Sequence, residues 1–320
     1  MTANLRYTIT AVLAAGVALA FMPWLLSDFL LSLALSCLMY VALASSWSMF
    51  SGATNYLSLA TSAFFGIGAY VTAWGLETLP YALAVPLGGV IAGAFAALVG
   101  AAVLHLRGAY FAVLTFGLGE LVRHSITYFE KTYARTVGRV LSDPPEAVTV
   151  YLTVLLITVA TVATCAAVRA SRFGLALAGV GADEERAQTL GVNTRRVKIA
   201  GFALSAFFAG ALGAAMAVRW TYIEPMSVFN PFIGFQTVLI AMIGGAQTLL
   251  GPVVSAVVFS LFSELLRLQF PYAYLIMLGV LLILLVLYLP GGMASLLRRP
   301  WRTNGTAKNQ SSIFRAGTFL

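Results

Sequence analysis

The sequence predicts an all-α membrane protein, built as a polytopic bundle of transmembrane helices. Of its 320 residues, 60% are hydrophobic and only 9% are charged, and the mean hydropathy is +0.92. A soluble domain of this length could not cover its surface with so few charges. Apolar runs long enough to cross about 30 Å of hydrocarbon recur along the chain. They lack the period-two alternation of a β-barrel, so helices are the expected spanning elements.

We expect about ten transmembrane helices, each close to the twenty residues that a bilayer requires. In chain order, their expected ranges are 8–26, 29–49, 57–76, 82–105, 109–127, 148–168, 199–218, 232–247, 250–267 and 272–290. The first could instead be a cleaved signal peptide, but apolar sequence continues beyond the small residues Ala18 and Ala20 and favours an uncleaved helix. Residues 1–302 then form one transmembrane domain, and the polar residues 303–320 form a disordered tail.

Basic residues gather in two places, and their position predicts the orientation of the chain. One group lies in a polar island at 169–198 (Arg169, Arg172, Arg186, Arg195, Arg196 and Lys198), and the other follows the last apolar run (Arg298, Arg299, Arg302, Lys308 and Arg315). Cytoplasmic loops of membrane proteins carry such an excess of Lys and Arg. We therefore expect both termini in the cytoplasm, a multi-pass position in the membrane, and no binding of nucleic acid.

Two short motifs recur at nearly the same offset. The tetrapeptide SAFF at 62–65 returns 143 residues later, and ELVR at 120–123 returns as ELLR 144 residues later. In the topology above, both copies of each motif run in the same direction. We interpret this as a parallel duplication, of the kind that transporters often contain. Coincidence in a sequence of low diversity is the alternative.

The halves of this duplication would be 57–168 and 199–290, with the polar island as their connector. Within the island, we expect a short amphipathic helix that begins with acidic residues and ends at a glycine. The residues of interest are Asp183, Glu184, Glu185, Ala187 and Gly191. Such a helix suits docking to a cytosolic protein; an ordinary solvated loop helix is the alternative.

The chain contains no recognisable catalytic motif. His105 and His124 stand alone, no phosphate loop of the G-x-x-x-x-G-K-[ST] type occurs, and no carboxylates cluster at membrane depth. Cys37 and Cys165 lie in apolar runs, as core residues do. We expect no catalytic residue, no metal site and no cofactor of its own, so an integral-membrane enzyme is disfavoured.

Two charged pairs, Glu120 with Arg123 and Glu264 with Arg267, have the i,i+3 spacing of neighbours on one helix face. Ionisable groups within a membrane often mark a transport route, and an autonomous secondary transporter would use Glu120 or Glu264 as its ion-coupled group. The alternative, which we favour, is that each pair neutralises itself near the outer end of its span and braces the bundle.

Several blocks of sequence resemble one known family. They are LSLATSAFFGIGAY (57–70), RGAYFAVLTFGLGELVR (107–123), SRFGLALAGVGADEERAQTLGVN (171–193), KIAGFALSAFFAGALGA (198–214), MIGGAQTLLGPVVSA (242–256) and LPGGM (289–293). In this order the chain resembles, from about residue 40 to residue 293, the inner-membrane permeases of ABC importers for branched-chain amino acids.

The resemblance implies a permease domain at 1–302 that pairs with a second permease, two cytosolic ATP-binding subunits and a periplasmic solute-binding protein. ATP would be bound by the partner subunits alone. It also makes 169–198 the loop that couples the permease to its ATPase, with Glu185, Ala187 and Gly191 at matching positions.

Residues that break or depart from the expected helices are the candidates for the translocation route. Glycines interrupt the third apolar run, glycines and a proline separate the eighth from the ninth, and Thr61 and Gln247 depart from the family's usual L-S-L-G-H and G-G-x-G-S sequences. Close helix packing is the alternative for the glycines and the one we favour for most of them; the break from Gly244 to Pro252 is the best candidate for irregular backbone that lines a cavity. The candidates are Thr61, Gly66, Gly68, Gly244, Gly245, Gln247, Gly251 and Pro252. Because of the departures, the substrate is either a branched-chain amino acid or another small solute such as urea, an amide or an aromatic acid.

Overall fold

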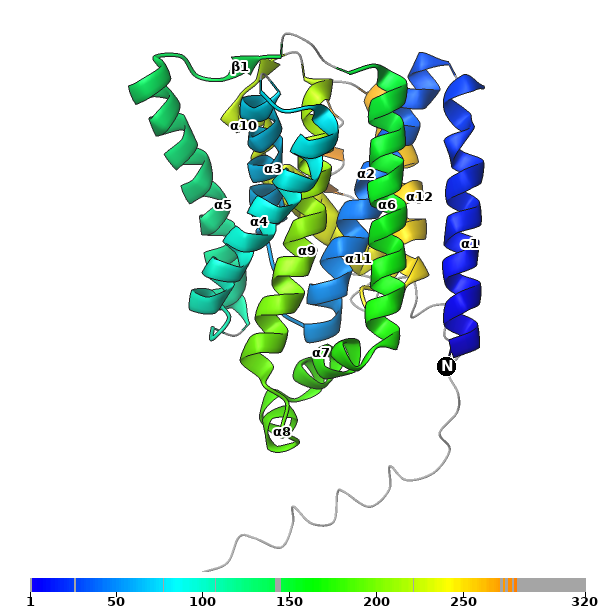
Figure 1. Ribbon diagram of the computed structural model, residues 1–320, viewed down its shortest axis with the longest axis vertical. Coiled ribbons are helices and arrows are strands. Elements are labelled where there is room, and N and C mark those ends of the chain that lie inside the picture. Colours follow the sequence, from blue (N-terminus) through cyan, green and yellow to red (C-terminus); the bar gives the residue numbers. More distant parts are fainter. Residues whose placement is uncertain are drawn as a thin grey trace, which may run out of the picture.

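The chain folds into a helical bundle with a small helical extension at one end (Figure 1). This computed structural model describes residues 2–280, with the exception of positions 26, 77, 107, 142–144, 221, 271, 272, 274, 275 and 278. The expected span at 272–290 lies largely outside the described residues, and the LPGGM block, the basic residues after it and the tail at 303–320 lie wholly outside them.

Long helices account for most of the described chain. In order they are α1 (Thr2–Ala20), α2 (Asp28–Trp47), α3 (Thr61–Gly75), α4 (Tyr81–Val103), α5 (Ala109–Phe129), α6 (Ala147–Ala170), α7 (Arg172–Ala182), α8 (Glu184–Thr189), α9 (Thr194–Met216), α10 (Pro225–Val228), α11 (Pro231–Gly244) and α12 (Leu250–Gln269). Short π-helical turns extend α2 (Ser48–Gly52) and α5 (Glu130–Ala134). The strands β1 (Arg139–Val140) and β2 (Tyr222–Ile223) pair antiparallel, with Arg139 opposite Ile223.

Among the described residues, seven helices are long and apolar enough to cross a membrane. The all-α, multi-pass expectation is therefore confirmed, whereas the expected count of ten is not. The expected span at 57–76 is shorter than predicted, because the backbone before Thr61 is not helical and Asn55 has a φ of 58°. The expected span at 109–127 does form a helix of 21 residues, α5, which carries Glu120, Arg123 and His124. This helix is not among the seven.

Helix α9 lies at the centre of the bundle and packs against α2, α3, α4 and α6. Small residues allow these helices to approach closely. A methyl group added at Gly68 of α3 would lie 1.8 Å from the carbonyl oxygen of Gly210 in α9, and one added at Gly88 of α4 would lie 2.7 Å from the Ala214 methyl. Glycine is thus required where α3 and α4 cross α9.

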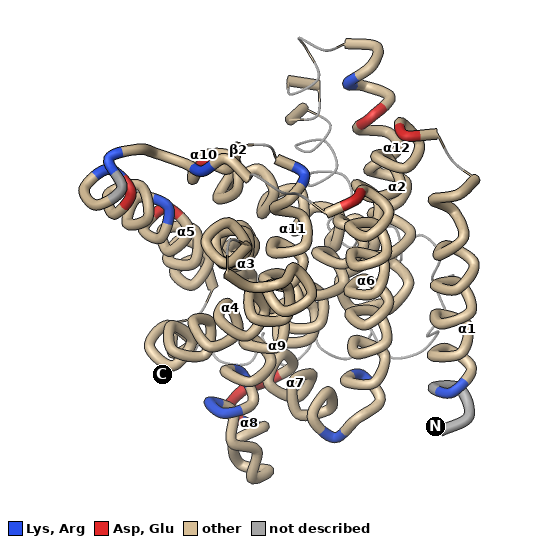
Figure 2. The backbone as a smooth tube through the Cα atoms, turned by 45° about the horizontal axis from the view of Figure 1, so that its top comes forward, with Lys and Arg blue, Asp and Glu red and all other residues tan. Residues whose placement is uncertain are grey.

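Charged residues lie mainly at the two ends of the bundle, and the helices between them are apolar (Figure 2). We call the end that carries α7 and α8 the α8 end, and the other, where α2 and α6 begin and α9 finishes, the opposite end (Figure 1). Large apolar side chains such as Leu98 and Val113 point outward from α4 and α5. A lipid environment suits that surface.

Candidate functional site

Helices α7 and α8 form a compact extension beyond the ends of α6 and α9 (Figure 1). Each helix that starts here has a side-chain cap. Ser171 accepts a hydrogen bond from the Gly174 amide, Asp183 accepts from Glu185 and Arg186, and Asn193 accepts from Arg196. Such caps satisfy amides that a helix leaves unpaired at its first turn. The acidic start expected for the island helix is confirmed, with Asp183 as the cap and Glu184 and Glu185 in the first turn.

The end of α8 depends on Gly191, whose φ is +85°. Its amide donates to the carbonyl of Gln188 at 2.9 Å, and the next amide, of Val192, donates to Ala187 at 3.0 Å. A side chain disfavours this left-handed conformation, so glycine is the expected residue here. Ala187 is buried and faces Gly179 of α7. The sequence therefore predicts both the helix and its end, and Ala187 provides its contact with α7.

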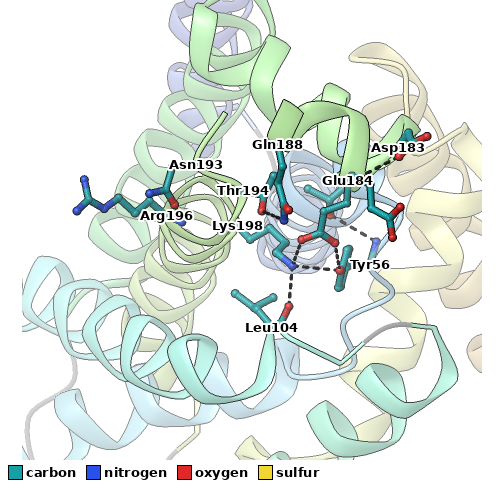
Figure 3. A network of polar contacts seen from close by, with 11 residues as sticks. Tyr56, Leu104, Asp183, Glu184, Gln188, Asn193, Thr194, Arg196 and Lys198 are labelled. Carbon is teal, nitrogen blue, oxygen red and sulfur yellow. Dashed lines mark hydrogen bonds and ion pairs between the residues drawn. The ribbon is translucent and has the colours of Figure 1, made fainter. Parts of the chain in front are cut away.

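A buried ion pair fastens α8 to the bundle (Figure 3). Lys198 of α9 places Nζ 2.6 Å from Glu184 Oε1, and the two side chains are only 5% and 10% exposed. Tyr56 donates to the other carboxylate oxygen at 2.8 Å, and its ring lies 4.9 Å from the same ammonium. Lys198 also donates to the Tyr56 hydroxyl at 3.1 Å and to the Leu104 carbonyl at 2.7 Å. A buried charge pair is tolerated only with such additional hydrogen bonds.

This network connects α8 and α9 with the segment before α3 and with the end of α4. Lys198 was expected in the cytoplasmic loop, but α9 begins at Thr194, five residues earlier than predicted, because Asn193 caps it there. Lys198 is consequently inside the helix and almost fully buried. Sequence reasoning missed both Lys198 and Tyr56. The available signal for Lys198 was its place after a capped helix start and before an apolar run, which puts the lysine inside a helix.

The segment before α3 also holds the end of α7. Asn55 donates from Nδ2 to the Gly181 carbonyl at 2.9 Å. A methyl group at Gly181 would lie 2.2 Å from the carbonyl oxygen of Ala53, so only glycine fits this approach. The left-handed backbone of Asn55, with φ of 58°, turns the chain at this point. A displacement of α7 or α8 must therefore move the chain that leads from α2 into α3.

A cavity of about 460 Å³ lies beside α7. Its wall includes Gly52, Asn55, Arg169, Gly181 and Gln247. The Arg169 guanidinium donates to the Gln247 carbonyl, to the Ala246 carbonyl at 3.1 Å and to Ser48 Oγ at 3.5 Å. Arg169, counted above only as a loop cation, thus joins the end of α6 to the α11–α12 connection and to the π-helical turn after α2.

The predicted route residues do not gather in one place. Gln247 lines the cavity just described, whereas Thr61 is buried at the start of α3. Gly66 and Gly68 do not interrupt α3, which is continuous; Gly66 lies against the Phe229 ring, with only 2.4 Å for an added methyl group. Both glycines are packing positions, because the Phe229 ring and the Gly210 backbone occupy the space that their side chains would need.

The expected break between the eighth and ninth spans is present, since α11 ends at Gly244 and α12 begins at Leu250. Gly245 has a φ of +88° and Pro252 is buried in the first turn of α12. A methyl group at Gly244 would lie 2.2 Å from the carbonyl oxygen of Gly251. The break therefore brings two helix ends into direct contact, and of the predicted residues in this region Gln247 is the one that lines the cavity beside α7.

Both predicted charged pairs form. Arg123 contacts Glu120 within α5, and Arg267 Nη1 lies 3.9 Å from Glu264 Oε2 in α12. The position expected for the first pair is wrong, because Glu120 lies near the middle of α5 rather than close to its end. The second pair is close to the end of α12, as expected.

No group of three His, Cys, Asp or Glu side chains within the described residues is arranged to hold a metal ion. Cys165 is buried and Cys37 partly buried, and both are free. His124 lies 3.8 Å from Glu120 and is largely exposed.

Comparison with known proteins identifies relatives over most of the chain. A family model described as "Branched-chain amino acid transport system / permease component" matches residues 29–286. The chain is 27% identical to the "High-affinity branched-chain amino acid transport system permease protein LivM" of Escherichia coli (strain K12), with 91% of this chain and 76% of that protein aligned. The protein of the same name from Salmonella typhimurium (strain LT2) matches with the same identity and coverage. No solved structure matches the chain.

Proposed function

The chain belongs to the branched-chain amino acid transport system permease family, and from this membership we propose that it is a membrane subunit of an ATP-driven importer. It passes a branched-chain or related amino acid across the bacterial inner membrane and has no ATPase site of its own. Its proposed partners are a second permease, two cytosolic ATP-binding subunits and a periplasmic solute-binding protein. Residues 1–302 form the permease domain, and ATP is bound by the partners.

The observation that carries this proposal is the attachment of α8 to the bundle. A loop helix with no function beyond solvation needs no buried anchor, yet α8 is fastened through Glu184 to Lys198 and Tyr56, with the pair 5% and 10% exposed. The outward residues Glu185 and Leu190 remain accessible, and Leu190 is 84% exposed. An accessible surface on a rigidly anchored helix suits the coupling of a cytosolic ATPase to the bundle.

The proposed coupling runs through packed chain. Movement of α8 pulls Tyr56 through Glu184, and movement of α7 presses Gly181 against Ala53. Both contacts lie on the connection between α2 and α3. Two access states can be biased only by contacts that differ between them, and these contacts are the candidates.

The orientation and the duplication belong to the same proposal. With α8 in the cytoplasm, the N-terminus is cytoplasmic as well, and the opposite end faces the periplasm. In support of a duplication of 57–168 as 199–290, α3 and α9 contact each other at nearly equivalent positions. Thr72 donates to the Ala214 carbonyl and Gly68 approaches the Gly210 carbonyl, each at a separation of 142 residues, close to the offset of 143 or 144 between the repeated motifs.

Uptake of radiolabelled leucine tests the proposal. We expect deletion of this chain, and separately replacement of the phosphate-loop lysine in the partner ATPase, to abolish uptake. Unchanged uptake after deletion would refute the assignment of leucine as substrate. Uptake that needs this chain but survives the ATPase change would instead favour a secondary transporter that uses Glu120 or Glu264.

Substitutions in α8 test the coupling assignment. Glu185→Lys and Gly191→Asp should abolish uptake while the protein still inserts into the membrane. Gly191→Asn is the matched control, because asparagine tolerates the left-handed conformation better than most residues and adds no charge. Normal uptake with both of the first two variants would refute the assignment.

A further inference from the structure

A second cavity, of about 350 Å³, lies at the opposite end of the bundle from α8. It is lined by the start of α2, the start of α6 and the short 3-10 turn Ala217–Arg219 that follows α9, elements that meet at the top of Figure 1. Its lining residues combine aliphatic side chains with two opposite charges: Asp28, Leu31, Ser32, Leu35, Val150 and Arg219. None of them was singled out by the sequence.

The two charged groups occupy different levels of the cavity. Asp28, Ser32 and Ser36 follow one another at four-residue intervals on α2, so they share one face and lie about one turn, ~5.4 Å, apart. Arg219 donates to Ser32 Oγ at 2.6 Å and to Ser36 Oγ at 3.5 Å. The guanidinium is therefore held by the hydroxyl groups of serines that lie one and two turns along α2 from Asp28, and Arg267 and Glu264 of α12 also act on it electrostatically.

This arrangement differs from a structural ion pair. Asp28 is exposed in the first turn of α2, and Arg219 ends the apolar span Thr194–Arg219. A carboxylate and a guanidinium line the same cavity without forming an ion pair with each other. They therefore present a negative and a positive charge to a ligand. Charged hydrogen bonds are the strongest that such a ligand can make, and the aliphatic part of the lining remains for an apolar group.

We propose that this cavity binds an α-amino acid as its zwitterion. Arg219 binds the carboxylate, Asp28 binds the ammonium group, and the aliphatic side chain packs against Leu35 and Val150. The inference rests on the proposed function and adds a site at which this chain itself recognises the solute. A phosphatidylethanolamine headgroup offers the same pair of charges, so the test includes lipid as a competing source.

The test measures binding of tritiated L-leucine to the full chain in phosphatidylcholine nanodiscs. Two competitors each lack one charge: 4-methylpentanoate has no ammonium group, and leucinamide has no carboxylate. Because a hydrogen bond to a charged group contributes about 1.5–3 kcal/mol, each competitor should bind about 10- to 100-fold more weakly than leucine.

Substitutions then assign each charge to its partner. Asp28→Asn should abolish the discrimination against 4-methylpentanoate and keep that against leucinamide, and Arg219→Gln should do the reverse. Arg219→Lys retains the positive charge and should keep most of the discrimination. It is the control for a loss of binding that comes from misfolding of the Arg219→Gln variant. Glu224→Gln and Arg139→Gln, which change matched charges outside the cavity lining, should bind both competitors as the unaltered chain does.

Several outcomes would overturn the proposal: no leucine binding to the unaltered chain, no discrimination between leucine and either competitor, or identical discrimination in the Asp28 and Arg219 variants. Leucine binding that vanishes when phosphatidylethanolamine is added would assign the cavity to lipid. Leucine uptake by the complete importer separates this inference from the proposed function. Normal uptake with a failed binding test refutes the site alone, and absent uptake by the unaltered importer refutes the function.

Discussion

The two ends of the bundle use the same kinds of charge in opposite ways. At the α8 end, Glu184 and Lys198 are 2.6 Å apart and nearly buried, and Tyr56 satisfies the remaining oxygen. At the opposite end, Asp28 and Arg219 line one cavity, and Arg219 contacts serines instead of the carboxylate. The comparison teaches that a paired, buried charge fixes a helix in place, whereas an acid and a base that line one cavity without contacting each other remain available to a ligand.

The largest effect should come from breaking the buried pair. Lys198→Met leaves the Glu184 carboxylate buried without its partner, which costs about 3–5 kcal/mol of unfolding free energy. We expect a clear fall in the thermal unfolding temperature of the purified permease. The double variant with Glu184→Leu removes both charges and should recover much of the loss. If the losses in unfolding free energy of the two single variants simply added in the double variant, a direct ion pair would be contradicted.

A smaller effect is expected from a substitution at Gly181 of α7. Gly181→Ala forces a methyl group to 2.2 Å from the Ala53 carbonyl oxygen, which we expect to cost about 1–3 kcal/mol and to impair uptake. Gly179→Ala is the matched control, since its methyl group would lie 4.0 Å from the Ala187 side chain, an ordinary contact. Equal loss of uptake in the two variants would show that the contact between α7 and the segment before α3 is not the cause.

The cap of α8 should contribute less to the unfolding free energy than the ion pair or the contact at Gly181. Asp183→Ala removes the acceptor for two amides, each at 3.1 Å, and should cost about 1 kcal/mol. Asp183→Asn keeps an acceptor and should stay close to the unaltered protein. Hydrogen exchange of the α8 amides measures this directly, and we expect faster exchange for the alanine variant only. Unaltered exchange would contradict a capping role.

The smallest effect on stability should be at the opposite end. Asp28→Asn removes an exposed charge that favours the start of α2, so the change should stay below about 1 kcal/mol. The exposed pair formed by Arg267 and Glu264 should behave alike, and Arg267→Gln should cost no more than about 1 kcal/mol. An unfolding temperature lowered as far as in Lys198→Met would remove the distinction between the two ends.

The sequence predicted the parts of this account that depend on local chemistry. Asp183 and Gly191 mark the start and end of α8, and the glycines after Met242 mark the break between α11 and α12, because caps and left-handed turns need particular residues at particular positions. The contact between Tyr56 and Lys198 joins residues separated by 142 positions. No local pattern encodes such a contact, so the partners of Lys198 could not be predicted even though its own position after a capped helix start was a signal.

The same reasoning explains where the sequence left two alternatives open. Gly66 and Gly68 do not break α3; they give room to the Phe229 ring and to α9, which is the packing alternative. Glu120 was also expected close to the end of its span, but it lies near the middle of α5. A glycine favours a break and a close approach alike, and only the packing of the neighbouring helix decides between them.

Photo-cross-linking from α8 in the assembled importer tests the central claim most directly. A photoreactive residue at Leu190, which is 84% exposed beside the anchored helix, should cross-link to the cytosolic ATP-binding subunit. The same residue at Leu98, which is 73% exposed on α4, should not. Absence of a cross-link from position 190, or equal cross-linking from both positions, would contradict the assignment of α8 as the helix that couples the permease to its ATPase.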